Sequence, residues 1–467
     1  MSSDPKQRGA TVKGASGAGD EGERGGPAGT GGADRKRQSL AEEGEKKVLN
    51  DELMEKVLAP ENLRAALRAV KANKGVAGID GIGTGELPAH LRKHWEGIRA
   101  KLESGRYRPS PVKAVEIEKS GGGERRLGIP TTVDRMIQQA LHQVLDGVFD
   151  PCFSDHSHGF RKGRSAHDAV KAAQAYVVEE GREHVVEIDI KAFFDHIDHD
   201  ILMRMVADKV RDKRVLKLIG RCLRAGVLEK GKVKRSTKGT PQGGPLSPLL
   251  GNIYLDALDR ELESRGVAFC RYADDVTIYA RSARSAERIL ASISKWIEKN
   301  LRLEVNREKS GTRPPDEGSF LGFRIEKDGR IALSEKSIEA FKAAVRLKWD
   351  NRRTPSGVET LEAWRKYARG WMSYFRLSER SWDWEDLEGW IRRHIRKWFW
   401  IRWHDWKGRR NALRRLGLPP ERIRLAHSSR GAWRVALALN TVLPNRWLKS
   451  HGFSMPSEIA KAWEITT

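Results

Sequence analysis

The sequence predicts an α+β fold followed by a mainly helical region, and two observations support this. Between residues 112 and 331, short β-branched or aromatic runs of strand type alternate irregularly with stretches of helical spacing. After residue 333 the spacing is wholly helical, and residues 335–467 contain 13 of the 15 tryptophans. We therefore expect the two parts to form separate domains.

Hydrophobic periodicity predicts the individual elements. Amphipathic helices are expected where apolar residues recur every three or four positions, at 62–71, 87–104, 166–179 and 285–300. Strands are expected at 115–117, 185–190, 268–272 and 276–280. Three C-terminal helices with aromatic stripes are expected at 338–349, 361–375 and 387–398. These stripes are most simply the core of that region.

Composition sets the limits of the folded part. Residues 1–48 contain eleven glycines and almost no large apolar side chains, which is typical of a disordered tail. No run approaches the ~18 apolar residues of a membrane span. The N-terminus has no apolar signal region, so a cytoplasmic protein is expected, associated with the nucleoid when it binds DNA. Three scattered cysteines argue against disulfides and against a Cys-rich zinc site.

The charge of the chain indicates a polyanionic partner. It has 87 Lys and Arg against 63 Asp and Glu, a formal net charge of +24. On a folded chain such an excess is typical of nucleic-acid binding. Residues 335–467 alone carry 28 Lys and Arg against 14 Asp and Glu. Charge by itself leaves both an enzyme and a structural binding protein open.

Adjacent aspartates give the strongest chemical signal. In Tyr272-Ala273-Asp274-Asp275, two strand-like runs flank the acids, as if they lay at the tip of a hairpin. Two carboxylates side by side repel each other unless a cation is present, and Mg²⁺ prefers carboxylate oxygens. An ordinary acidic turn is the alternative. Asp189, at the end of an apolar strand, is a second acid that is costly to bury unless it is paired or metal-bound.

Three further segments have weaker signals. The loop Pro241-Gln242-Gly243 lies between the two aspartate strands, where glycine permits close approach of a ligand to the backbone. Turn and cap roles are favoured for the acids Asp195, Asp198 and Asp200. A loop with a packed histidine is favoured over a metal site for Asp155, His156 and His158.

Taken in order, these segments resemble the palm of a reverse transcriptase, and more narrowly the group II intron reverse transcriptase/maturase family. The resemblance extends from about residue 60 to 450. The matching motifs are residues 125–130 (RRLGIP), 158–165 (HGFRKGRS), 241–243 (PQG), 272–275 (YADD), 303–310 (LEVNREKS), 320–323 (FLGF) and 369–375 (RGWMSYF).

The resemblance implies an RNA-directed DNA polymerase shaped as a right hand, with antiparallel sheet in its fingers and palm. The implied regions are a tail at 1–48, fingers with a template-binding extension at 49–180, palm at 181–334, helical thumb or maturase domain at 335–410, and a basic nucleic-acid-binding region at 411–467. Its implied cofactors are two Mg²⁺ ions, with deoxynucleoside triphosphates as substrates. Its implied partners are an RNA template, a DNA primer and a group II intron RNA that it helps to splice.

The resemblance also implies site residues. Asp189, Asp274 and Asp275 would be catalytic. The metal ligands would be these three and Ile190. The nucleotide-binding residues would be Lys119 and Arg125 on the triphosphate, Phe194 against the ribose 2′ position, Gln242 in the pocket and Lys309 near the pyrophosphate. The nucleic-acid-binding residues would be Arg161, Arg164, Arg369, Arg392, Arg393, Arg396 and Lys397. For Arg392, Arg393, Arg396 and Lys397, the alternative is a basic helix face that is only solvated.

One departure from the family pattern bears on mechanism. Many members end in a zinc-associated endonuclease built around cysteine pairs, whereas here no cysteine follows Cys270. The expectation is the compact branch without endonuclease. Two other functions remain open: a non-enzymatic splicing maturase, and a reverse transcriptase that acts in DNA repair or phage defence.

Overall fold

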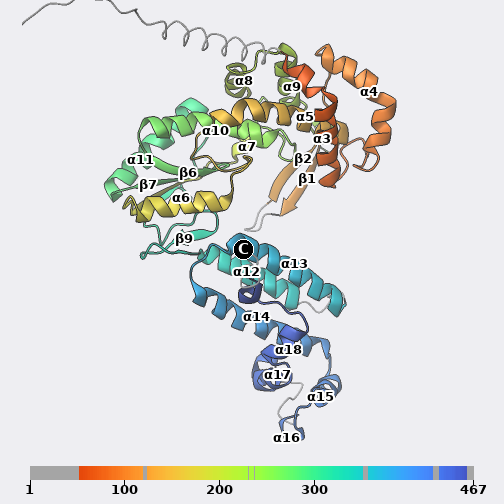
Figure 1. Ribbon diagram of the computed structural model, residues 1–467, viewed down its shortest axis with the longest axis vertical. Coiled ribbons are helices and arrows are strands. Elements are labelled where there is room, and N and C mark those ends of the chain that lie inside the picture. Colours follow the sequence, from red (N-terminus) through yellow and green to blue (C-terminus); the bar gives the residue numbers. More distant parts are fainter. Residues whose placement is uncertain are drawn as a thin grey trace, which may run out of the picture. The chain divides into compact units, whose positions relative to one another are not determined.

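A computed structural model describes residues 52–118, 124–229, 231–235, 237–350, 356–423 and 431–459. The predicted disordered tail lies outside these residues. The described part contains three sheets and a series of helices (Figure 1). None of its helices is long and apolar enough to cross a membrane.

Six helices and a four-stranded sheet come from two stretches of the chain, residues 53–149 and 199–234. The helices are α2 (Leu53–Val57), α3 (Pro60–Ala72), α4 (Leu87–Glu103), α5 (Thr132–Phe149), α8 (His199–Ala207) and α9 (Lys213–Leu223). The strands, in the order β2-β1-β4-β5, are β2 (Glu124–Ile129), β1 (Val112–Glu118), β4 (Val227–Glu229) and β5 (Lys232–Lys234). The predicted helices at 62–71 and 87–104 are confirmed. The β1–β4 pair is parallel, unlike the expected antiparallel sheet, because these strands lie far apart in sequence and no hairpin turn dictates their direction.

The central sheet is wholly antiparallel, with the order β6-β7-β3-β8. Its strands are β6 (Ala268–Tyr272), β7 (Asp275–Ala280), β3 (His184–Ile188) and β8 (Gly311–Arg313). β3, β6 and β7 confirm three of the predicted strands.

Helices cover both faces of this sheet. Val186 and Ile188 of β3 belong to one core together with residues of α10 (Ser247–Ser264) and α11 (Ala283–Trp296). Val185 faces the other way and belongs to a second core with α6 (Ala166–Val178). The alternation follows from the period of two in a strand, and burial on both faces explains why β6 and β7 have apolar residues at successive positions.

The C-terminal part is helical, as predicted. Its three main helices are α12 (Glu335–Trp349), α13 (Gly357–Phe375) and α14 (Ser381–Arg402), which confirm the three aromatic stripes. Trp349 and Trp364 are fully buried, with ring centroids 5.6 Å apart. Four shorter helices follow: α15 (Trp406–Arg415), α16 (Pro420–Ile423), α17 (Ala436–Val442) and α18 (Asn445–Ser450). The two-stranded sheet of β9 (Phe323–Ile325) and β10 (Ile331–Leu333) precedes α12.

Candidate active site

The adjacent aspartates lie at the tip of the β6–β7 hairpin, as predicted. Tyr272, the last residue of β6, pairs with Asp275, the first residue of β7. The tight turn places Ala273 in the left-handed region, at φ 59°. Asp275 is exposed and Asp274 is half-buried, so the hairpin presents both acids at one end of the central sheet.

Asp189 reaches the same end of the sheet from the neighbouring strand. The β3–β7 ladder ends at the pair Ile188–Val276, so the next positions on the two strands are Asp189 and Asp275. The backbone of Asp189 is held on its other side by two hydrogen bonds. Its N–H donates to Ser310 Oγ (3.0 Å), and its carbonyl accepts from the N–H of Asn306 (2.8 Å).

The charges of these acids act on one another. The pKa of Asp275 is raised to about 6, first because surrounding protein removes its carboxyl from water and then because the charges of Asp274 and Asp189 oppose its ionisation. Lys336 acts in the opposite direction. Asp275 is exposed as a whole residue. Among the described residues, neither Asp275 nor Asp189 forms a salt bridge with a Lys or Arg.

This donor set fits a magnesium ion that also binds substrate. No group of three or more His, Cys, Asp or Glu among the described residues is arranged to hold a metal ion by itself. Mg²⁺, however, is usually bound by one or two carboxylates together with substrate phosphates rather than by a closed protein cage. The raised pKa of the Asp275 carboxyl is the condition that such an ion would relieve.

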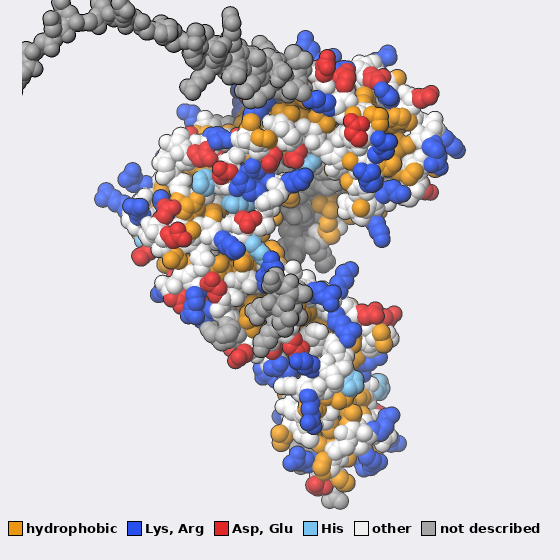
Figure 2. All heavy atoms as spheres, viewed as in Figure 1, with side chains coloured by type: hydrophobic (Ala, Val, Ile, Leu, Met, Phe, Trp, Pro, Cys, Tyr) orange, Lys and Arg blue, Asp and Glu red, His pale blue; other side chains and the backbone are white. Residues whose placement is uncertain are grey.

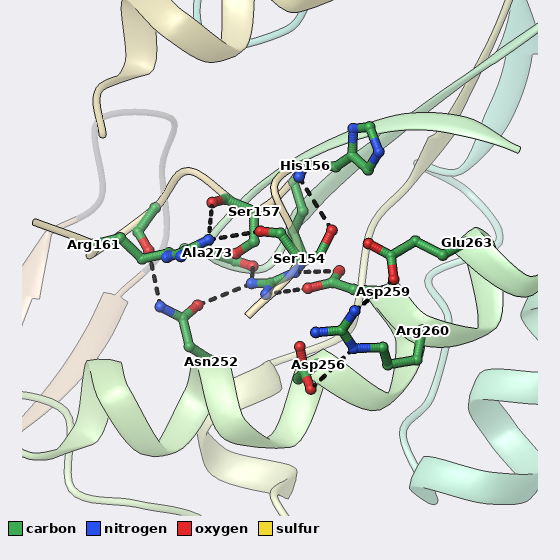
Figure 3. A network of polar contacts seen from close by, with 12 residues as sticks. Ser154, His156, Ser157, Arg161, Asn252, Asp256, Asp259, Arg260, Glu263 and Ala273 are labelled. Atoms are coloured by element: carbon green, nitrogen blue, oxygen red, sulfur yellow. Dashed lines mark hydrogen bonds and ion pairs between the residues drawn. The ribbon is translucent and has the colours of Figure 1, made fainter. Parts of the chain in front are cut away.

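A buried arginine fixes the turn that carries Asp274. Arg271, on β6, is fully buried, and its Nε and Nη2 donate to the two oxygens of Asp259 at 2.7 and 2.6 Å. Its Nη1 donates to Asn252 Oδ1 and to the carbonyl of Ala273, both at 2.9 Å (Figure 3). Asn252 and Asp259 are seven residues apart on α10, so both lie on the helix face turned towards the hairpin.

A glycine allows a second loop to pack against the same turn. A Cβ atom on Gly159 would lie 2.2 Å from the backbone nitrogen of Ala273, so only glycine fits there. The carbonyl of Gly159 accepts a hydrogen bond from Asn252 Nδ2 at 2.9 Å. His158 and Arg271 are also joined, by a backbone bond of 2.8 Å from the His158 N–H. The loop and the hairpin are thereby held as one unit.

Two of the predicted nucleotide-binding residues line one cavity of about 610 Å³. Phe194 lies on the short helix α7 (Phe193–His196), and its backbone carbonyl accepts from the N–H of Thr240 (2.8 Å), which anchors the glycine-containing loop. Gln242 of that loop donates from Nε2 to Asp195 at 3.1 Å. The same cavity is lined by Phe160, an aromatic residue that is 51% exposed.

Comparison with known proteins agrees with this arrangement. Residues 117–325 match the family of reverse transcriptases (RNA-dependent DNA polymerases), and residues 338–417 match the group II intron maturase-specific domain. Protein YkfC of Escherichia coli K12 is 30% identical over 313 residues, which cover 58% of this chain and 82% of YkfC. The chain belongs to the group II intron reverse transcriptase/maturase family. Its fold is that of a right-hand polymerase with a helical thumb, and the central sheet is its palm.

Other relatives match over shorter stretches. The group II intron-encoded protein LtrA of Lactococcus lactis subsp. cremoris is 39% identical over 205 residues, covering 44% of this chain and 34% of LtrA. Among solved structures, telomerase from Candida albicans in complex with a fragment of telomeric RNA aligns with a TM-score of 0.41 and 12% identity. That alignment covers 66% of this chain and 63% of the telomerase chain.

The remaining predicted nucleotide-binding residues differ in what the structure shows of them. Lys119 lies outside the described residues, and of Arg125 only the backbone, in β2, is described. Lys309 is exposed, in the turn between Asn306 and Ser310 that holds the backbone of Asp189. Ile190, which was predicted as a metal ligand, is buried and forms an isolated β-bridge with Val305.

The two predicted nucleic-acid-binding residues of the fingers region have partners within the protein. The side chain of Arg161 is 6% exposed, and it bonds Asp150 as well as the carbonyls of Ser154 and Ser157. Arg164 forms an ion pair with Asp155. Both residues therefore shape the loop that contains Gly159. His156 packs on Phe269 in this loop, which agrees with the packed-histidine interpretation.

The predicted basic residues of the thumb divide into two groups. Arg369 and Arg393 are exposed. Among the described residues, Arg393 donates only to the Gly389 carbonyl of its own helix, at 3.4 Å. The other three have side-chain partners or are buried: Arg396 donates to Asn445 and to the Leu443 carbonyl, Lys397 to Asp350, and Arg392 to Glu388. Burial lowers the pKa of Arg396 to about 10. The face of α14 expected to bind RNA is thus partly an internal polar contact.

Sequence reasoning missed Arg271, Asn252 and Asp259. A signal existed for each. Arg271 is a charged residue within the otherwise apolar run of β6, which requires a buried partner. Asn252 and Asp259 repeat at seven residues among apolar residues of α10, which indicates polar side chains on one buried helix face.

Proposed function

We propose that this protein is an RNA-directed DNA polymerase in which Asp189, Asp274 and Asp275 hold the divalent ions for nucleotidyl transfer. The observation that carries the proposal is the meeting of these three acids at one end of the palm sheet, without a salt bridge on Asp189 or Asp275 among the described residues. Two bound Mg²⁺ ions would favour ionisation of a primer 3′-hydroxyl and neutralise charge on the leaving pyrophosphate.

The chain's own residues orient the substrates. Phe194 and Gln242 line the cavity that would receive the incoming deoxynucleotide, where a rigid ring excludes a ribose 2′-hydroxyl by steric contact. Lys119 and Arg125 would hold the triphosphate, since cations suit that group. Lys309 would supply a proton to the pyrophosphate. The Ile190 carbonyl would complete the metal ligands.

Nucleic acid is the partner that the family implies, and we propose an RNA template and a DNA primer. We also propose that the maturase-specific domain assists splicing of a group II intron RNA, with Arg369 and Arg393 as its exposed contacts. Support comes from the match at residues 338–417 and from the name of LtrA, a group II intron-encoded protein.

Primer extension on an RNA template with Mg²⁺ and deoxynucleotides tests the proposal. Asp274→Ala is expected to lower the extension rate by at least about 10²–10³-fold, because a preorganised electrostatic group is lost. RNA affinity should stay within about threefold, since the acid contributes no attraction to phosphate.

Asp208→Ala is the matched control, because Asp208 is an exposed aspartate that follows α8, outside the acid cluster. It should keep wild-type extension. Loss of extension and of RNA affinity in parallel in Asp274→Ala would contradict the division of roles. No extension by the wild type, together with salt-sensitive RNA binding, would favour a splicing maturase without polymerase activity.

A further inference from the structure

A basic groove lies at the end of the palm hairpin opposite the aspartates. The groove has a volume of about 720 Å³ and includes the first residues before β6, the last residues of β7 and one side of α11. Its cationic lining residues are Arg182, Arg265, Arg281, Arg288 and Lys295. No acidic residue of the described chain lines it. Figure 2 shows Lys and Arg side chains gathered at the edge of the molecule over this part of the palm.

Its position makes this groove separate from the active site. β7 begins at Asp275 and ends at Ala280, and Arg281 follows. A strand rises about 3.3 Å per residue, so six residues place Arg281 roughly 20 Å from the acids. That distance exceeds the reach of any single nucleotide contact, so the groove cannot belong to the nucleotide pocket.

Three of the five cations in the groove form no salt bridge with the described residues. Arg182 and Arg265 form ion pairs with Glu180 and Glu261. Within the described chain, Arg281, Arg288 and Lys295 form no salt bridge, and all three are exposed. Three like charges that share a hollow repel one another, which costs stability unless an anion binds there.

The spacing along α11 suits a repeating anion. Arg288 and Lys295 are seven residues apart, and between them Ser292 Oγ accepts from Arg265 Nη1 (3.0 Å) and donates to the Ile289 carbonyl (3.2 Å). Seven residues correspond to two helical turns and a rise of about 10 Å, which places both cations on one face. Ile293 and Ala286 are buried on the opposite side of the helix, so the basic side remains open to solvent.

We infer that this groove binds the phosphodiester backbone of RNA, outside the active site. The inference rests on the proposed function, because RNA is the polyanion that this protein would carry. Lys and Arg donors in a groove that no acid of the described chain lines are groups that contact phosphates independently of sequence. A membrane surface is less suitable, since none of the exposed large apolar side chains of the described residues lines the groove.

Direct binding of a labelled, folded RNA hairpin without primer tests the inference. The double variant R288E/K295E removes two cations of the groove. Its matched control, R204E/K217E, makes the same charge change at exposed positions of α8 and α9, which do not line the groove. Thermal unfolding shows whether each variant is folded, and R288Q/K295Q replaces the reversal variant if that one melts early.

The groove variant should bind the hairpin about 5–10-fold more weakly at 0.1 M salt. Its plot of log K against log salt should be shallower by about one to two, because each phosphate contact contributes about 0.9 to the slope. The control should change affinity less than twofold. Equal losses in both variants, or no loss in the groove variant, would overturn the inference. Loss of binding to anionic lipid vesicles with RNA affinity unchanged would also overturn it.

Extension of a short oligo(dT) primer on poly(rA) separates this inference from the proposed function. Both double variants should extend it at the wild-type rate, because the groove lies far from the acids. If the wild type extends no primer, the proposed polymerase function is wrong. If the groove variant nevertheless loses hairpin binding and its control does not, the inference about the groove is still supported.

Discussion

The two ends of the palm hairpin carry Asp275 and Arg281, charges of opposite sign that form no salt bridge among the described residues, whereas Arg271, next to the turn, is fully paired. At one end Asp275 has no salt bridge among the described residues, and at the other neither has Arg281. Arg271 and Asp259 are both completely buried and bonded to each other through two contacts. One short hairpin therefore contains three different arrangements of charge.

The difference in pairing distinguishes a charge that supports the fold from charges that are available to a ligand. A buried pair stabilises only if all its donors and acceptors are used, and Arg271 uses Nε, Nη1 and Nη2. Charges that remain unpaired at a surface lower stability unless a ligand compensates them. In this hairpin, the paired charge positions the turn, and the unpaired charges mark where ions or phosphates would bind.

The largest effect is expected from removing the buried arginine. Arg271→Met would leave Asp259 buried without a cation, a change that typically costs about 3–5 kcal/mol of stability. Urea unfolding measures that cost. The double variant Arg271→Met/Asp259→Leu should recover much of the stability, since apolar replacement of both partners is often nearly neutral.

Activity then distinguishes positioning from stability. In the double variant the carbonyl of Ala273 still lacks its donor, so primer extension should remain low although the protein is stable. Recovery of extension together with stability would show that Arg271 only supports the fold.

An intermediate effect is expected at the glycine beside the turn. Gly159→Ala would force the backbone of Ala273 to move, because the new Cβ would lie 2.2 Å from its nitrogen. A displacement of about 1 Å at reacting groups can cost 10²-fold in rate, so primer extension should fall by about that factor.

Gly147→Ala serves as the control for the added methyl group. Gly147 lies within α5 with no atom within 4 Å of the added carbon, so alanine should stabilise the protein by about 0.4–1 kcal/mol and leave extension unchanged. Wild-type extension by Gly159→Ala would show that the turn tolerates movement.

Sequence patterns predicted three of the four strands of the palm sheet, and the main helices, because their apolar residues repeat with a clear period. They also placed Asp274 and Asp275 at a hairpin tip. The sequence patterns did not predict which Lys and Arg side chains would be buried within the protein. Arg393 and Arg396 lie on the same basic run, yet Arg396 is buried against Asn445, far along the chain. Pairing of this kind depends on tertiary contacts that composition and spacing do not contain.

The smallest effect is expected from neutralising Asp275 in the metal-free protein. Its pKa is raised to about 6 from an ordinary value near 3.8, so the folded protein binds the proton more tightly than the unfolded chain. The contribution of this carboxyl to stability therefore becomes unfavourable as pH rises from about 4 to 6 and stays so above 6. Asp275→Asn removes the charge and should melt above the wild type at pH 8.

That difference should shrink as the pH falls through 6, because the wild-type carboxyl then becomes neutral as well. The measurement is thermal unfolding of both proteins in chelator between pH 5 and pH 8, where groups common to both cancel. Saturating Mg²⁺ should reduce the difference at pH 8, since a bound cation stabilises the ionised wild type and not the amide. A difference independent of pH and of Mg²⁺ would show that the acidic end of the hairpin carries no uncompensated charge.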